Sequence, residues 1–264
     1  MDLQVTDRVA VITGASSGIG LHTAKQLQFE GVKLLLTDMP GVNWSDAESV
    51  LGDFELVEAD LTQQDECQSV VDRAIHHFGG CHILVHSAGI TGEKGHPLEM
   101  SDEAWREAWD IDFLSAVRIS RAAIPEMRKA QWGRAVFITS ENAVQPYADE
   151  AVYNTAKAAL GCFVKNLSKV EGKHGVLINS VAPAFIETPM TNSMMEQRAE
   201  EMGIDVEEAV ASFLDQERPG ITAKRRGKPE EVAAIITMLC SERASFVNGS
   251  NYRVDCGSVM TADY

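Results

Sequence analysis

Short apolar runs rich in β-branched residues alternate with longer stretches of helical spacing along almost the whole chain. The first run, 8–12, is followed by a glycine turn, a helical stretch over 21–29 and a second apolar run over 32–37. Strand, turn, helix and strand in this order form a βαβ unit, whose right-handed crossover produces a parallel sheet. We therefore expect an α/β fold with a parallel sheet of about seven strands. The expected strands are 8–12, 32–37, 54–59, 82–85, 134–139, 176–181 and 252–254, and the expected helices are 21–29, 63–78, 101–129, 153–170, 191–202, 205–217 and 230–239.

The longest helical stretch, 101–129, is expected to be broken near its end. Ser101 precedes acidic residues in the first turn and is a suitable N-cap. Pro125 lacks the amide hydrogen that a helix interior requires, so it is expected to kink or interrupt the helix.

A pair of helical stretches, 191–202 and 205–217, follows the sixth strand and carries several methionines. The pair has two interpretations of equal weight: ordinary helix packing, or an adaptable lid over an apolar substrate. Neither repeats nor a linker-like segment interrupt the pattern. We therefore expect one dinucleotide-binding and catalytic domain over 1–264, with a helical substrate-lid insertion at about 189–226.

Composition and charge exclude several classes of function. With 45% hydrophobic and 23% charged residues, the 264-residue chain has the composition of an ordinary globular protein. Its net charge of −16 opposes nucleic acid and anionic membranes as partners. No apolar run approaches the length of a membrane span, and no signal sequence is visible at the N-terminus. Five dispersed cysteines without Cys-x-x-Cys spacing indicate reduced thiols in a cytoplasmic protein, and no residues have the spacing of a metal site.

A glycine-rich turn after the first apolar run predicts a nucleotide-binding loop. In Gly14-x3-Gly18-x-Gly20, the first glycine permits a tight turn, the second lets backbone amides approach a phosphate, and the third lets helix and strand pack closely. Asp38 closes the second strand, where a carboxylate can accept hydrogen bonds from the adenosine ribose and would repel a 2′-phosphate. No basic residue lies in the turn or directly after Asp38. The sequence therefore predicts NAD(H) in preference to NADP(H).

The stretch from Ser140 to Lys157 carries the residue types for acid–base chemistry at an alcohol or carbonyl. Tyr153 and Lys157 stand four residues apart in a predicted helix, so they share one face. An ammonium beside a phenol favours the phenolate, so we expect Lys157 to lower the pKa of Tyr153 toward working pH. Ser140, at the end of the fifth strand, can hold the same reacting oxygen by a hydrogen bond. The Tyr-x3-Lys pattern is weak alone and gains weight only from its neighbours.

Candidate residues gather at one edge of the predicted sheet. Each follows directly on a predicted strand, and the carboxyl ends of parallel strands form the edge at which open α/β sheets bind ligands. This agreement across separate strands is stronger than any one motif. The residues are Gly14, Asp38, Asp60, Gly89, Ser140 and Pro183.

Together these residues resemble the short-chain dehydrogenase/reductase family, in its single-domain NAD-linked branch. The motifs match in order and spacing from the glycine turn to Thr188, and the likeness covers nearly the whole chain. The resemblance implies Tyr153 as acid/base, Ser140 as partner of the reacting oxygen, and Lys157 as ligand of the nicotinamide ribose. It also implies a doubly wound Rossmann-type sheet with helices on both faces, and a homotetramer or homodimer. The cofactor-binding residues are expected to be Gly14, Ser16, Ser17, Gly18, Ile19, Gly20, Asp38, Asp60, Leu61, Ser87, Ala88, Gly89, Tyr153, Lys157, Pro183, Ile186 and Thr188.

Several positions depart from the family's pattern. Asp112 aligns with the family's fourth catalytic residue, an asparagine, and is expected to help hold a water linked to Lys157. His86-Ser87 replaces an Asn-Asn pair, and we expect His86 to be structural. Glu141, next to the candidate serine, is expected to have a structural or substrate-orienting role. The substrate candidates are Glu141, Ala184, Met190 and Met194.

The sequence thus predicts an NAD(H)-dependent oxidoreductase that interconverts a secondary alcohol and a ketone. Tyr153 would move the proton, while hydride passes to or from nicotinamide C4. On the lid interpretation the substrate is apolar and not small: a cyclic, steroid-like or hydroxyacyl compound. The alternative is a protein that binds NAD(H) without catalysis, as a sensor or scaffold. Asp112 and His86 leave that alternative open. The intact set of Ser140, Tyr153 and Lys157 opposes it.

Overall fold

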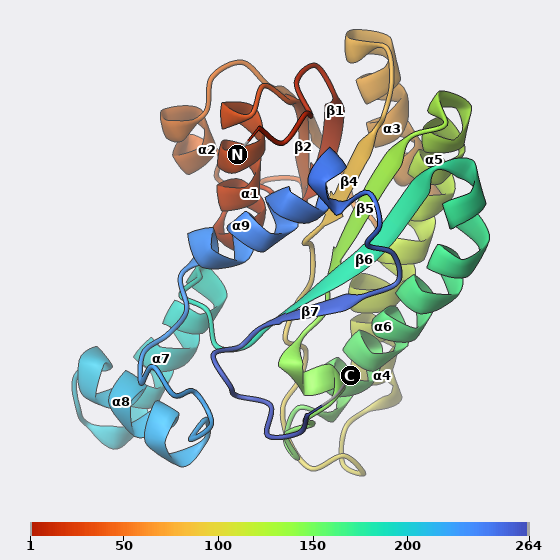
Figure 1. The fold of residues 1–264 in the computed structure, drawn as a ribbon. Coiled ribbons are helices and arrows are strands. Elements are labelled where there is room, and N and C mark those ends of the chain that lie inside the picture. Colours follow the sequence, from red (N-terminus) through yellow and green to blue (C-terminus); the bar gives the residue numbers. More distant parts are fainter. Residues whose placement is uncertain (1, 263–264) are drawn as a thin grey trace.

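The computed structural model describes residues 2–262 and contains a seven-stranded parallel sheet with helices on both faces (Figure 1). The strand order is β3-β2-β1-β4-β5-β6-β7, so the chain runs outward from β1 on one side and returns to build the other side. The order reverses between β1 and β4, which is the point at which open α/β sheets bind ligands. The strands are β1 (Val9–Thr13), β2 (Lys33–Asp38), β3 (Glu55–Glu58), β4 (Ile83–His86), β5 (Gly133–Ile138), β6 (Val176–Pro183) and β7 (Asn251–Val254).

Successive residues of the central strands enter two separate cores. Ala10 and Ile12 pack with Leu27 of α1 in the core beneath one helical layer. Val9 and Val11 belong to the core on the opposite face. Because both faces are covered, the central strands β1, β4 and β5 are buried at every position rather than at alternate ones. The first layer contains α1 (Gly18–Phe29), α2 (Ser45–Val50) and α9 (Pro229–Leu239), and the second contains α3 (Gln64–Phe78), α5 (Ser115–Ala130) and α6 (Ala151–Glu171).

The helical stretch before β5 is broken, but not where Pro125 predicted. It contains α4 (Asp102–Trp109), a π-helical turn over Asp110–Leu114, and α5, which runs through Pro125 to Ala130. The helix is thus not interrupted at Pro125, and its buried face packs against the sheet on both sides of the proline. The π turn occurs at Asp112 instead, and such turns are frequent at functional sites. Ser101 caps α4 as expected, accepting a hydrogen bond from the Ala104 amide.

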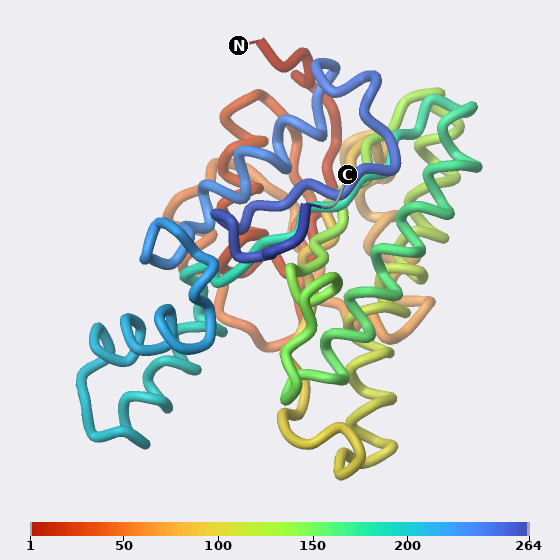
Figure 2. Tube along the Cα trace, turned by 60° about the horizontal axis from the view of Figure 1, so that its bottom comes forward, coloured from red at the N-terminus to blue at the C-terminus, as the bar shows by residue number. Residues whose placement is uncertain are grey.

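The helices α7 (Pro189–Met202) and α8 (Val206–Gln216) project beyond the carboxyl edge of the sheet (Figures 1 and 2). They have a small core of their own, in which Met195 and Phe213 pack with Phe185. Most of the apolar side chains of this pair therefore serve helix packing, the first of the two interpretations.

The two ends of this insertion meet at its base. Ile186 and Gly227 form a parallel bridge. The Glu187 amide donates to the Gly227 carbonyl at 2.8 Å, and the Gly227 amide donates to the Phe185 carbonyl at 3.0 Å. The two ends of the segment thus lie side by side, and the segment makes a further contact with the body of the protein where the Thr222 amide donates to the Cys256 carbonyl at 3.0 Å.

The described residues carry no helix that is long and apolar enough to cross a membrane. Within residues 2–262, no cluster of three or more histidine, cysteine or acidic side chains could hold a metal ion. All five cysteines are free thiols.

Candidate active site

A cavity of about 660 Å³ opens at the carboxyl edge of the sheet. All six of the residues that the sequence places after strand ends line it, so the edge predicted from the strand pattern is a real concave site. Four predicted residues do not line the cavity: Gly20, Asp112, Glu141 and Met194. The predicted residues that line it are Gly14, Ser16, Ser17, Gly18, Ile19, Asp38, Asp60, Leu61, Ser87, Ala88, Gly89, Ser140, Tyr153, Lys157, Pro183, Ala184, Ile186, Thr188 and Met190.

The glycine turn between β1 and α1 is so tightly packed that a side chain at Gly14 or Gly20 would clash with neighbouring backbone. Gly14 has φ +61°, and a Cβ there would lie 2.8 Å from the Ala88 amide nitrogen. A Cβ on Gly20 would lie 2.2 Å from the Gly14 carbonyl oxygen, which explains why this residue packs behind the cavity without lining it. The N-terminus of α1 is therefore accessible from the cavity, and its free amides suit a pyrophosphate.

Asp38 closes β2 and ties the glycine turn to the second strand. Its Oδ2 accepts hydrogen bonds from the Ser16 amide at 3.1 Å and the Ser16 hydroxyl at 2.7 Å, and its Oδ1 accepts one from the Met39 amide at 2.9 Å. Lys157 is the one basic residue among the described residues that line the cavity, and it lies at the other end with Ser140 and Tyr153. The Asp38 carboxylate is an acceptor of the kind that ribose hydroxyls need, and no cation lies beside it for a 2′-phosphate.

His86 is a buried brace between three elements. Its Nδ1 lies 3.0 Å from the Thr13 hydroxyl at the end of β1, and its Nε2 lies 3.2 Å from the Ser115 hydroxyl at the start of α5. Thr13 Oγ1 in turn accepts hydrogen bonds from the amides of Ser87 and Ala88. Burial, and then the charge of Lys157, lower the pKa of His86 to about 3. These contacts agree with a neutral structural histidine that fixes the loop after β4.

Ser140, Tyr153 and Lys157 come together from β5 and the first turns of α6. The Lys157 ammonium lies 5.5 Å from the centre of the Tyr153 ring and donates to the Ile138 carbonyl at 3.3 Å. A hydrogen bond with Ser140 acts on the Tyr153 hydroxyl and lowers its pKa. Strand end and helix start thus bring a hydroxyl, a phenol and an ammonium to one wall of the cavity.

Asp112 contacts Lys157 directly. Its Oδ1 lies 3.3 Å from the Lys157 ammonium and accepts a hydrogen bond from the Ile90 amide at 3.0 Å. Its Oδ2 is buried and has no hydrogen-bond partner in the described structure. The π turn places this carboxylate behind the cavity wall, where it balances the lysine charge. Burial raises the pKa of Asp112, and Lys157 opposes that shift.

The prediction that Lys157 brings the pKa of Tyr153 down was wrong in its net direction. Burial of the phenol is the largest effect and raises the pKa above the ordinary value of tyrosine. Lys157 lowers it, as predicted, but the negative charge of Asp112 raises it again. Burial and the Asp112 charge are tertiary effects that the four-residue spacing could not reveal.

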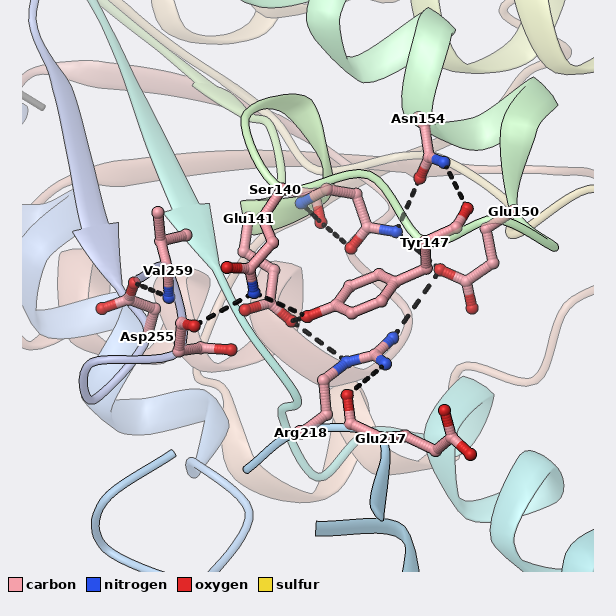
Figure 3. Close-up of polar contacts among 12 residues, drawn as sticks. Ser140, Glu141, Tyr147, Glu150, Asn154, Glu217, Arg218, Asp255 and Val259 are labelled. Atoms are coloured by element: carbon pink, nitrogen blue, oxygen red, sulfur yellow. Dashed lines mark hydrogen bonds and ion pairs between the residues drawn. The ribbon is translucent and has the colours of Figure 1, made fainter. Parts of the chain in front are cut away.

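The substrate candidates separate into two groups. Ala184 and Met190 line the cavity, whereas Met194 does not. Glu141 is turned away into a buried cluster, where it accepts a hydrogen bond from Tyr147 and pairs with Arg218 (Figure 3). Of the two roles expected for Glu141, the geometry supports the structural one.

The sequence reasoning missed much of the apolar lining. These residues lie on loops, on the π turn and at the end of β5, where apolar side chains look like ordinary core, so no local signal distinguishes them. They include Met39, Val42, Ile90, Ile111 and Ile138.

Comparison with known proteins decides the family. The model described as "Enoyl-(Acyl carrier protein) reductase" matches residues 14–259, nearly the whole chain. An uncharacterized oxidoreductase, YvrD of Bacillus subtilis, is 30% identical over 99% of this chain and 100% of its own. The chain belongs to the short-chain dehydrogenase/reductase family. Members of this oxidoreductase family bind a nicotinamide cofactor, which agrees with the glycine turn and the acid–base residues described above.

Two other short-chain dehydrogenases/reductases bear on substrate and cofactor. The D-beta-hydroxybutyrate dehydrogenase of Cupriavidus necator is 30% identical over 96% of this chain and 98% of its own. The structure of L-sorbose reductase from Gluconobacter frateurii, complexed with NADPH and L-sorbose, has a TM-score of 0.91 and 33% identity, covering 99% of this chain and 100% of its own. This short-chain dehydrogenase/reductase is therefore similar over nearly its whole length to relatives whose names give different substrates.

Proposed function

We propose that this protein interconverts a secondary alcohol and a ketone with NAD(H) as cofactor. The observation that carries the proposal is the pairing, in one cavity, of Ser140, Tyr153 and Lys157 with the Asp38 carboxylate. The first three residues supply acid–base chemistry at an oxygen, and Asp38 supplies a ribose site without a counter-charge for phosphate.

The cofactor part of the proposal depends on Asp38. A bound NAD would supply the hydride acceptor, and NADH the hydride donor. Ser16 already donates two hydrogen bonds to Asp38, which orients the carboxylate toward the adenosine end. We expect kcat/KM to be higher with NAD than with NADP, and the double substitution Asp38→Ser with Met39→Arg to reverse that order. A wild-type preference for NADP, the phosphorylated cofactor found with L-sorbose reductase, would refute this part of the proposal.

The proton path uses residues of this chain. In reduction the Tyr153 phenol donates its proton to the substrate oxygen, and in oxidation the phenolate takes the hydroxyl proton. Ser140 holds the same oxygen by a hydrogen bond. Burial lowers the pKa of Lys157, but Asp112 and Tyr153 together raise it above its usual value, so the ammonium stays charged beside the phenol. Asp112 keeps that ammonium in place through the 3.3 Å ion pair.

The substrate is proposed to be an apolar secondary alcohol or ketone, of cyclic, steroid-like or hydroxyacyl type. Supporting this, the cavity wall formed by the start of the insertion carries Ala184, Ile186 and Met190. The test is a panel that includes cyclic alcohols, 3-hydroxyacyl compounds and sugar alcohols, followed through the absorbance of NADH. Turnover restricted to the sugar alcohols would overturn the apolar class while leaving the reaction type intact.

The alternative of an NAD(H)-binding sensor or scaffold predicts a different result on the same panel. Tight NADH binding without turnover of any alcohol or ketone would favour it. We prefer the catalytic function to the sensor because Ser140, Tyr153 and Lys157 share one wall of the cavity. As further parts of the proposal, the chain is one domain with its lid over about 189–226, and it works in the cytoplasm as a homotetramer.

A further inference from the structure

A cluster of buried polar side chains lies behind Ser140, outside the cavity lining (Figure 3). We call it the Arg218 cluster, and its members are Glu141, Asn142, Tyr147, Glu150 and Arg218. Tyr147 is half-buried, and the other four are buried. None of these residues is part of the proposed proton path. Four of them belong to the segment between Ser140 and α6, whereas Arg218 follows α8.

Arg218 is the member that joins distant parts of the chain. Its Nε lies 3.3 Å from Glu141 Oε1, and its Nη2 lies 3.8 Å from Glu150 Oε2. Its guanidinium carbon lies 3.2 Å from the centre of the Tyr147 ring, so the planar group stacks on the phenol. The Tyr147 hydroxyl donates to the same oxygen of Glu141 at 3.1 Å. A single arginine thus fixes two carboxylates and an aromatic ring at once.

The cluster reaches Ser140 through Asn142. Ser140 Oγ accepts a hydrogen bond from the Asn142 amide at 3.2 Å and donates to Asn142 Oδ1 at 3.1 Å. Asn142 Nδ2 donates to Glu150 Oε2 at 2.5 Å and to Asn154 Oδ1 at 2.9 Å. Both of those partners are acceptors, so the side-chain oxygen of Asn142 must face Ser140. The direction of the Ser140 hydroxyl is therefore set by the same carboxylate that Arg218 approaches.

The cluster also holds the segments around the substrate end of the cavity. Lys94, in the loop after β4, donates to Glu150 Oε1 at 2.6 Å and lies 3.5 Å from the Met194 sulfur on α7. On the other side, Gln145 donates to the Ser258 carbonyl of the C-terminal segment at 3.0 Å. Glu150 is consequently in contact with Lys94 of the loop after β4 and with Arg218 of the helical insertion.

Stability alone is a poor account of these charges. Desolvating an ion pair offsets most of its attraction, and an apolar replacement of similar shape is often as stable. A buried ion pair can instead be retained because it favours one conformation of the chain over others. Here the arrangement that Arg218 selects has α8 seated and the Ser140 hydroxyl directed by Asn142.

We propose that Arg218 is a positioning residue that couples the seating of α7 and α8 over the substrate to the orientation of Ser140. When the insertion is seated, Arg218 lies between Glu141 and Glu150 and the Ser140 network is complete. When the insertion moves away, Glu141 and Glu150 lose their shared cation, and the turn at Glu141–Ala143 loses its anchor. Beneath a seated lid Asn142 engages the Ser140 proton, so the remaining lone pair of Ser140 Oγ can accept a hydrogen bond from a substrate hydroxyl. This inference rests on the proposed function, in which Ser140 holds the reacting oxygen.

The kinetic test uses Arg218→Met, Arg218→Lys and, as a matched control, Arg225→Met. Arg225 is an exposed arginine of the same insertion that pairs with Glu231. Arg218→Met is expected to raise the KM for the alcohol and to lower kcat on the order of tenfold to a hundredfold, because Ser140 is misplaced. The Kd for NADH should be unchanged. Arg218→Lys should recover part of kcat, and the control should match wild type. A rise in KM with unchanged kcat would overturn the coupling, since Arg218 would then act on the lid alone.

Hydrogen exchange tests the same coupling without turnover. We expect Arg218→Met to speed amide exchange both in 206–216 and in 141–150, whereas faster exchange in 206–216 alone would refute the inference. If Arg218→Met fails to fold, Arg218→Met with Glu141→Gln removes the unpaired buried carboxylate, and the same two regions are compared. If wild-type protein turns over no alcohol or ketone, the proposed function fails, while the exchange result still decides whether the two segments are coupled.

Discussion

At the scale of single residues, burial and the charges around Tyr153 determine the protonation state of its phenol. Burial and Asp112 raise the pKa of Tyr153, while Lys157 and Ser140 lower it, and the raising effects are the larger. The phenol is therefore protonated across neutral pH. A protonated phenol is a proton donor, so on the proposed function we expect ketone reduction to be favoured at neutral pH and alcohol oxidation in alkaline solution.

The first prediction concerns Tyr153→Phe. Removing the hydroxyl removes the proton donor and acceptor, so turnover should fall by about 10²- to 10⁴-fold. The ring still packs on Lys157, so NADH binding, measured by fluorescence titration, should be nearly intact. A variant that keeps most of its rate would contradict the assigned role.

The second prediction concerns pH and Asp112. In wild type the oxidation rate should rise with pH as the raised pKa of Tyr153 is approached, and the reduction rate should fall. Asp112→Asn removes a negative charge that raises this pKa, so the oxidation profile should move to lower pH. The measurement is kcat/KM for oxidation from neutral to alkaline pH in both proteins. A shift to higher pH would show that loss of the Lys157 contact dominates instead.

At the scale of elements, the glycine turn and the π turn differ in how far the sequence could foresee them. The strand–turn–helix pattern is local, so it predicted the glycine turn and the residues after the strand ends. The π turn at Asp112 and the continuous helix through Pro125 depend on packing against the sheet, which local spacing does not encode. The Arg218 cluster was missed for the same reason, because Glu141 and Arg218 meet only in the folded chain.

The third prediction separates two glycines in helices. Gly20→Ala places a Cβ 2.2 Å from the Gly14 carbonyl oxygen, so the free energy of unfolding should drop by about 1–3 kcal/mol and NADH binding should weaken. Gly161→Ala, in α6, meets nothing within 4 Å and should raise stability by about 0.5–1 kcal/mol. Chemical denaturation of the two variants checks both values. Equal effects would mean that the close contact at Gly20 relaxes freely.

At the scale of the whole molecule, several large apolar side chains remain exposed on this chain. Phe246, between α9 and β7, is fully exposed, and Trp109 and Leu114 on the stretch before α5 are partly so. A net charge of −16 opposes non-specific association, so an interface here would have to be specific. These observations support the proposed homotetramer.

The fourth prediction concerns that assembly. Light scattering on wild-type protein should give four times 28.8 kDa. Phe246→Glu should shift the mass toward smaller species, whereas Phe246→Leu, which keeps an apolar side chain, should not. A wild-type mass of one chain would remove the tetramer from the proposal.

The base of the helical insertion has a practical consequence. Because Ile186 and Gly227 lie side by side and the segment between them carries its own small core, that segment can be exchanged as a cassette between homologous enzymes without recutting the sheet. On the proposed function we expect chimaeras of this kind to change substrate preference, provided that they keep Thr188, an expected cofactor-binding residue that lies within the segment. Any donor cassette must bring an arginine equivalent to Arg218, or the graft would dock without restoring catalytic competence.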